Sequence, residues 1–142
     1  MATFVKFNKF LEQLAEKAYN LGSDTLKFAL TNTAPTAATD TVFDPITKHP
    51  PPVAANGYPS GGIAATIDSS SESGGTYTLA STTDKVFTAT AGGIGPFRYV
   101  ILYDDTAAND ELIAYWDYGS SITLASGETF TIDVTASLLT IT

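Results

Sequence analysis

The last third of the chain, residues 95–142, alternates apolar and aromatic residues with polar ones, and this pattern constrains the fold more than any other. Alternation with a period of two places successive side chains on opposite faces of a strand. The pattern is interrupted at Asp, Asn, Gly and Ser, which are turn-forming residues. Several such strands with no helix between them predict an antiparallel sheet that buries one face.

Shorter runs extend this β prediction to most of the chain. We expect strands at 3–7, 24–31, 63–69, 76–80, 85–89, 99–104, 111–117, 121–124, 129–135 and 138–141. The Ser- and Gly-rich residues 69–75 predict a hairpin tip, and residues 125–128 predict a turn. The expected fold class is mainly β. It is an antiparallel β-sandwich or barrel-like body in a single domain of 142 residues, with one N-terminal helix and a long Pro-containing loop.

The one expected helix spans about residues 9–21. Asn8 is a suitable N-cap, and Gly22 is a suitable residue to follow the C-terminal end. An apolar stripe at helical spacing is formed by Phe10, Leu14, Ala18 and Leu21. We interpret this stripe as core packing against the sheet, in preference to a free partner-binding helix.

A long irregular segment is expected at about residues 32–62. Its three consecutive prolines cannot donate ladder hydrogen bonds and favour extended polyproline II structure. Irregular segments beyond about 15 residues are uncommon in compact domains and are usually functional or disordered. This one also carries apolar side chains, at Val42, Phe43, Ile46, Val53 and Tyr58. We therefore expect an arm that lies on its own body or on a neighbouring subunit.

Charge is distributed unevenly along the chain, whose net charge is −8. Residues 1–50 hold five lysines and five acidic residues, whereas residues 51–142 hold Lys85 and Arg98 against ten acidic residues. The second part therefore carries all of the net charge. An acidic body repels phosphates, so we expect no direct binding to nucleic acid. The neutral N-terminal part is the better candidate for docking on a partner.

Cysteine is absent, which excludes disulfides, Cys-ligated zinc and thiol catalysis. The apolar run at 99–103 is far shorter than the roughly 20 residues of a membrane helix. The first ten residues are interrupted by lysines and lack the apolar region of a signal peptide. We expect synthesis in the cytoplasm and no membrane partner.

One loop concentrates acidic groups, and Ca²⁺ prefers such oxygen ligands. The candidate ligands are Asp104, Asp105, Asp110 and Glu111, with Asn109 beside them. The spacing of an EF-hand is absent, and Asp and Asn are also ordinary turn residues. Turn formation is therefore the favoured interpretation, and a metal site is the weaker one.

The sequence offers no clear catalytic set. Residues 92–95 (GGIG) precede a strand and not a helix, so a tight turn is favoured over a phosphate-binding loop. His49 is the single histidine and lies beside the prolines, so we interpret it as an exposed loop residue. No nucleophile elbow accompanies it. We predict no enzyme activity and no cofactor.

Aromatic residues cluster near the predicted central strand, at Tyr99, Tyr103, Tyr115, Trp116 and Tyr118. They are compatible with a sugar-binding platform. However, residues 99–103 are apolar on both strand faces, which predicts cover on both sides by the core and by the helix, the arm or another subunit. Aromatic residues are also enriched where subunits meet, so subunit contact is favoured. The predicted partner interface comprises Phe4, Phe7, Val42, Phe43, Ile46, Pro50, Pro51, Pro52, Val53, Tyr58, Tyr99, Tyr103 and Trp116.

Two blocks of sequence carry a resemblance to a known family. They are FVKFNKFLEQLAEKAYNLGSDTLKFALTNTAP at 4–35 and GPFRYVILYDDTAANDELIAYWDYGSSITLASGETFTID at 95–133, together about half of the chain. These blocks resemble a family of small virion structural proteins of tailed bacteriophages. The triple proline at 50–52 departs from the family pattern, so the resemblance implies no role for that loop.

The resemblance implies a capsid decoration (cement) protein. Its partners would be the major capsid protein and copies of itself, in a homotrimer on the capsid surface, after synthesis in the host cytoplasm. The alternative is a tail or tail-fibre component that binds a receptor or glycan. The absence of repeats disfavours a fibre shaft. A tail-tube subunit is a further alternative, since it would also be a compact β-protein.

Overall fold

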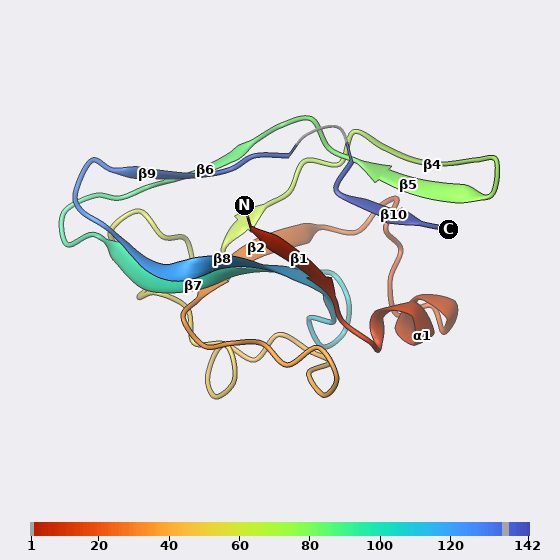
Figure 1. Ribbon diagram of the computed structural model, residues 1–142, viewed down its shortest axis with the longest axis horizontal. Helices are drawn as coiled ribbons and strands as arrows, with labels where there is room; N and C mark the ends of the chain where they lie inside the picture. The colour runs from red at the N-terminus through yellow and green to blue at the C-terminus, as the bar shows by residue number, and fades with distance from the viewer. Residues whose placement is uncertain (1, 135–136) are drawn as a thin grey trace.

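The computed structural model describes residues 2–134 and 137–142, and it confirms a mainly β fold (Figure 1). Every strand pairing in this part of the chain is antiparallel. The elements are β1 (Thr3–Lys6), α1 (Phe10–Ala15), β2 (Leu26–Thr31), β3 (Ile63–Ala64), β4 (Ser69–Ser73), β5 (Thr76–Ala80), β6 (Lys85–Thr88), β7 (Ile94–Asp104), β8 (Leu112–Leu124), β9 (Thr129–Ile132) and β10 (Leu139–Ile141).

The strands lie in two layers. One layer is a five-stranded sheet with the order β1-β8-β7-β2-β3. The second layer contains the three-stranded sheet β10-β5-β4 and the two-stranded ribbon β6-β9 (Figure 1). The short helix α1 lies at one end of the five-stranded sheet. The main core fills the space between the layers, because the alternating runs of β2 and β7 turn one set of large side chains toward it.

The central strand β7 is buried on both faces, as its uninterrupted apolar run predicts. Val100 and Leu102 belong to the core between the layers. Ile101 and Tyr103 belong to a smaller cluster on the opposite face of the sheet. The partner strands β2 and β8 bury their own residues in the same two clusters, so β7 is an interior strand of a covered sheet.

The helix prediction is too long. Residues 10–15 are helical, and the chain leaves the helix at Lys17, whose φ is +65°. A Schellman motif closes the helix there, because the Ala18 N–H donates to the Gln13 carbonyl at 2.8 Å and the Lys17 N–H donates to the Leu14 carbonyl at 3.2 Å. The predicted N-cap is also wrong, since Lys9 occupies that position without a side-chain cap. The core interpretation of the apolar stripe is confirmed, because Phe10 and Leu21 are buried in the main core and Leu14 and Ala18 pack against it.

Several strand boundaries depart from the prediction; β7, for example, begins at Ile94, where a start at residue 99 is predicted. The run at 63–69 gives only the two-residue β3, and the predicted hairpin tip at 69–75 contains β4 before its turn. The runs at 111–117 and 121–124 form one continuous strand, β8. The run at 129–135 ends as a strand at Ile132, and its residue 135 lies outside the described residues.

One predicted turn is confirmed, and a second is displaced along the chain. Residues 125–128 join β8 to β9, with a hydrogen bond from the Glu128 N–H to the Ala125 carbonyl at 3.0 Å. The turn before β7 lies slightly earlier than the predicted 92–95, because the Gly93 N–H donates to the Thr90 carbonyl at 3.0 Å, and Ile94 and Gly95 already belong to β7. Gly93 is required there, because its φ is +76° and a Cβ would lie 2.4 Å from the Leu124 carbonyl oxygen.

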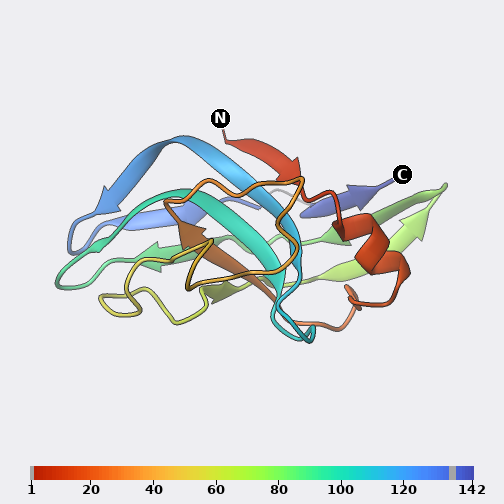
Figure 2. The ribbon, with the colours of Figure 1, turned by 90° about the horizontal axis from the view of Figure 1, so that it is seen from below.

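Most of the predicted arm, residues 32–62, packs across the face of the five-stranded sheet that points away from the second layer, whereas its Tyr58 joins the main core and stacks on Phe87 of β6. Figure 2 shows this orange-to-yellow segment in front of β7 and β8. Its regular structure is limited to one isolated bridge between Val42 and Glu111. Of the two positions expected for the arm, on its own body or on a neighbouring subunit, the structure shows the first.

Candidate interaction surfaces

Main-chain and side-chain hydrogen bonds anchor the arm along its length. The Asn8 N–H donates to the Ala37 carbonyl at 3.0 Å, near the start of the arm. The Thr31 hydroxyl donates to the Pro50 carbonyl at 3.0 Å, and the Tyr103 hydroxyl donates to the Gly61 carbonyl at 2.8 Å. A segment without a strand ladder is therefore held to the body by separate, identifiable contacts.

An aromatic stack forms the centre of the arm contact. The Phe43 ring lies between Tyr103, with ring centroids 4.5 Å apart, and His49, with centroids 5.9 Å apart. The interplanar angles are 18° and 11°, so the three rings are nearly parallel. Tyr103 comes from β7, and the other two residues come from the arm. Burial is the main cause that raises the pKa of Tyr103, which keeps its hydroxyl protonated as a donor.

His49 is fully buried, so the prediction of an exposed loop histidine is wrong. Its Nε2 lies 3.2 Å from Asp40, and its Nδ1 accepts the Asp44 N–H at 3.2 Å. The acceptor role of Nδ1 assigns the proton of the neutral ring to Nε2. Burial lowers the pKa of His49 despite the carboxylate beside it. Because both ring nitrogens are engaged, this histidine is a structural clasp of the arm in this conformation.

Asp40 is the second half of this clasp. Its carboxylate accepts the Thr36 N–H at 2.7 Å and the Lys48 ammonium at 3.1 Å, in addition to the histidine. Burial raises the pKa of Asp40, but the combined donors outweigh it and hold the pKa below its usual range. The carboxylate is thus ionised and well solvated by protein groups, which is how a buried charge is tolerated.

Part of the arm stays exposed. Ile46 is 86% exposed and Val53 is 79% exposed, so these branched apolar side chains project into solvent from a segment that is otherwise anchored. Pro50 is also exposed and Pro51 is half-buried, whereas Pro52 is buried. We call the surface formed by Ile46, Pro50, Pro51 and Val53 the arm tip.

The structure divides the predicted partner interface into two groups. The side chains packed inside the chain itself are Phe7, Phe43, Pro52, Tyr58, Tyr99 and Tyr103. For these six residues the prediction of a free contact surface is corrected, because their apolar area is already buried by β7, the arm and the core. The accessible residues are Phe4, Val42, Ile46, Pro50, Pro51, Val53 and Trp116.

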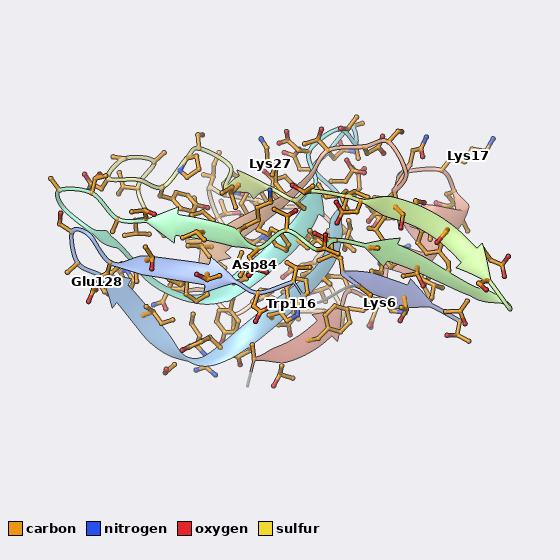
Figure 3. The ribbon with its side chains drawn as sticks, turned by 90° about the horizontal axis from the view of Figure 1, so that it is seen from above. Lys6, Lys17, Lys27, Asp84, Trp116 and Glu128 are labelled. Atoms are coloured by element: carbon orange, nitrogen blue, oxygen red, sulfur yellow. The ribbon has the colours of Figure 1, made fainter. Side chains whose placement is uncertain are left out.

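A second apolar surface lies between the layers. A groove of about 700 Å³ runs between β1 and β8 on one side and the β9 and β10 segments on the other. Its apolar lining includes Phe4, Trp116, Tyr118, Phe130, Ile132 and Leu138. Phe4 and Tyr118 are 45% and 51% exposed, and Phe4 contacts Trp116 with ring centroids 5.3 Å apart. Figure 3 shows Trp116 near the middle of the molecule, between Lys17 and Glu128 at its opposite ends.

Sequence reasoning missed the contribution of β9 and β10 to this groove. The alternation in residues 129–132 does predict a strand, and it places Phe130 and Ile132 on one face. However, β9 pairs with β6, from far earlier in the chain, and this pairing decides that the face lies opposite Trp116. No local signal carries that information.

The acidic loop is built as a turn. Asp104 Oδ1 accepts the N–H groups of Thr106 at 2.8 Å and Ala107 at 3.1 Å, while Glu111 accepts two hydrogen bonds from Asn109. Asp105 pairs with Lys27 at 2.8 Å. Across residues 2–134 and 137–142, no three His, Cys, Asp or Glu side chains are grouped so that they could hold a metal ion. The four candidate ligands therefore do not converge on one point.

Comparison with protein-family models, curated proteins and solved structures finds no match for this chain. In the described part of the chain, no helix has both the length and the apolar character needed to cross a membrane.

Proposed function

We propose that this chain is a structural protein of a tailed-bacteriophage virion, and most specifically a capsid decoration protein that binds the head shell as a homotrimer. The observation that carries the proposal is the arm tip. Ile46 and Val53 are 86% and 79% exposed on a segment that hydrogen bonds hold in place. An anchored apolar projection loses little conformational entropy when a partner covers it, which favours binding.

The position of the two apolar surfaces supports assembly from identical copies. The arm tip belongs to the outer face of the five-stranded sheet, whereas the groove opens between the two layers. A closed ring of three subunits is built from one surface of each copy against a different surface of the next. A protomer with two distinct apolar surfaces satisfies this requirement. Repetition of modest contacts over a symmetric shell then strengthens attachment through multivalency.

The test is binding to empty, expanded capsid shells of the phage that encodes the chain. We expect saturable co-sedimentation of the parent protein and loss of binding in the double variant Ile46→Ser with Val53→Ser. The matched control is Val86→Ser, which removes an exposed apolar side chain of β6, outside the arm. Equal binding by parent and double variant overturns the role of the arm tip. No binding by any form overturns the decoration function.

A tail protein that binds a receptor glycan is the second candidate, and the groove favours it. Aromatic faces stack on sugar rings, and Phe4, Trp116 and Tyr118 present such faces at the groove. Glycan-array binding that is lost in Tyr118→Ala, with the circular dichroism spectrum unchanged, would support this function. Tyr118 is chosen because it is half-exposed, so its removal spares the core. A silent array for the parent protein excludes it.

A further inference from the structure

The groove between the layers combines aromatic faces with available hydrogen-bond donors. Its lining includes Phe4, Trp116, Tyr118 and Phe130, and the first and third of these are about half-exposed. No described residue accepts a hydrogen bond from the indole N–H of Trp116 or from the hydroxyl of Tyr118. Such a groove suits a segment that brings apolar rings and backbone carbonyl oxygens, since its own groups can donate to those oxygens.

The size and charge of the groove restrict its occupant. Its volume of about 700 Å³ lies within the range of roughly 300–1,000 Å³ found for small-molecule sites, so it can hold a few side chains but not a folded surface. Asp133 is the one charged residue of its described lining, which contains neither Lys nor Arg. The groove therefore favours a short apolar segment whose charge is neutral or positive.

The arm tip has these properties. A proline run with three residues per turn places residues i and i+3 on the same side. The exposure of the run agrees with this, because Pro50 and Val53 are exposed whereas Pro52 is buried. Lys48 is the only charged residue in 45–56, and half of its side chain is exposed. Proline-rich segments dock in aromatic-lined grooves because their fixed backbone loses little conformational entropy on binding.

The arm cannot fill the groove of its own chain. Consecutive residues of β8 point to opposite sides of the sheet, since Tyr115 packs against the small cluster under the arm and Trp116 packs against the main core. The five-stranded sheet therefore separates the arm from the groove. Figure 2 shows the arm in front of β7 and β8 from below, and Figure 3 shows Trp116 from above. An arm that enters the groove has to come from another molecule.

We propose that the arm tip of one copy docks in the groove of a second copy, with Pro50 and Val53 against the aromatic rings. The Pro51 carbonyl, to which no described group donates, accepts a hydrogen bond from the Trp116 indole. The positively charged part of the tip lies toward the acidic rim. Each copy gives one arm and receives another, so the contact is heterologous and repeats around a closed ring. Only the number of three copies in this ring rests on the proposed decoration function.

The decisive experiment mixes two variants, each of which lacks one side of the contact. The arm variant is Ile46→Ser with Val53→Ser, and the groove variant is Phe4→Ser with Tyr118→Ser. All four side chains are exposed, so their removal spares the core. We expect each variant alone to be monomeric in sedimentation equilibrium at concentrations where the parent protein is assembled. The mixture keeps one intact arm and one intact groove, so it should form a heterodimer that does not grow further.

A second measurement uses the parent protein and does not depend on the folding of the groove variant. Trp116 is the only tryptophan of the chain, so its fluorescence reports whether the groove is filled. Dilution of the assembled parent should shift the emission to longer wavelength, because water enters the groove when the arm leaves. The control Val86→Ser, whose side chain is 44% exposed compared with 45% for Phe4, should assemble and shift as the parent does.

Three results would each overturn this contact. They are a parent protein that is monomeric at every concentration, an assembly that leaves the Trp116 emission unchanged, and a mixture of the two variants that forms no heterodimer. An emission that responds to a glycan or to capsid shells, but not to self-association, assigns the groove to that other occupant. Failure of the decoration function gives a different result, because the parent would then assemble through arm and groove without binding to empty shells.

Discussion

The two faces of the five-stranded sheet are covered in different ways. The inner face meets a second layer of strands and buries large apolar side chains such as Phe28, Phe97 and Leu102. The outer face meets the arm, which contributes one small apolar cluster around Phe43 and a polar clasp at Asp40 and His49. Burial of apolar area is the main contribution to the first contact, whereas individual hydrogen bonds and ring stacks are the main contribution to the second.

This difference has a physical consequence. A contact made by many apolar side chains tolerates pH change, because none of its groups titrates. A contact that depends on a neutral histidine and an ionised carboxylate is sensitive to pH and to single substitutions. We therefore expect the arm to detach from the sheet under conditions that leave the core folded, and the following predictions test whether the two regions unfold separately.

The largest effect is expected for Phe28→Ala, in the core between the layers. The side chain is fully buried and contacts Trp116 across the groove floor. Phe→Ala substitutions at such sites cost about 3–5 kcal/mol of unfolding free energy. Urea denaturation followed by Trp116 fluorescence measures this loss. A cost below about 1 kcal/mol would mean that the two layers are not held together by this core.

Phe43→Ala should cost less and act locally. Phe43 is 5% exposed and fills the space between Tyr103 and His49, so its removal leaves a cavity under the arm. We expect a loss of about 3 kcal/mol, at the lower end for buried aromatic residues, since the arm is able to collapse onto the gap. Limited proteolysis should show faster cleavage within residues 32–62 while the strands stay intact. A uniform increase in cleavage rate throughout the chain would contradict separate unfolding of the arm and the core.

These contrasts also explain what could be predicted from the sequence. Alternation alone places β5 at Thr76–Ala80, with both ends as expected, and the turn at 125–128. Such elements depend on neighbours in the chain, so local patterns suffice. The stripe of Phe10 and Leu14 is likewise identified correctly as core, even though the helix that carries it is shorter than expected.

Most of the missed features depend on distant partners. The early end of the helix is an exception, because a local Schellman motif forms with Lys17 in the left-handed conformation, a position where glycine is the usual residue. His49 is buried because Asp40 and Phe43 fold around it and Tyr103 supports the stack. The same long-range packing buries Tyr58 and Tyr99, whose apolar character alone suggested a surface for partners. Sequence patterns identify which residues need cover but not which segment covers them.

Acidification should release the arm before it affects the core. Burial holds the pKa of folded His49 below its ordinary 6.5, so the unfolded arm binds a proton that the folded arm excludes. Stability of the arm is therefore full above pH 6.5 and decreases as pH falls toward the folded pKa. Protonated Nδ1 also loses the Asp44 N–H bond, worth about 1 kcal/mol. Amide exchange of residues 41–50 at pH 7 and pH 5, corrected for intrinsic rates, measures the change.

The matched variant for this pH effect is His49→Gln. Glutamine is neutral at every pH and offers one donor for Asp40 and one acceptor for the Asp44 N–H. Arm exchange in this variant should be nearly independent of pH between 6.5 and 5. Persistence of the full pH dependence would assign the effect to another group.

The smallest effect on stability is expected at the arm tip. Ile46→Ser and Val53→Ser remove side chains that contact little of the chain, being 86% and 79% exposed. Each substitution should change the unfolding free energy by no more than about 0.5 kcal/mol.

The double variant with both substitutions should nevertheless abolish the self-association of the parent protein, measured by sedimentation equilibrium. A docking surface is recognised by this combination: its apolar side chains add little to the stability of the fold, but their removal abolishes association. If the double variant instead loosens the arm to the extent that Phe43→Ala does, the tip belongs to the packing of the outer face, and the distinction between the anchored and the projecting parts of the arm is wrong.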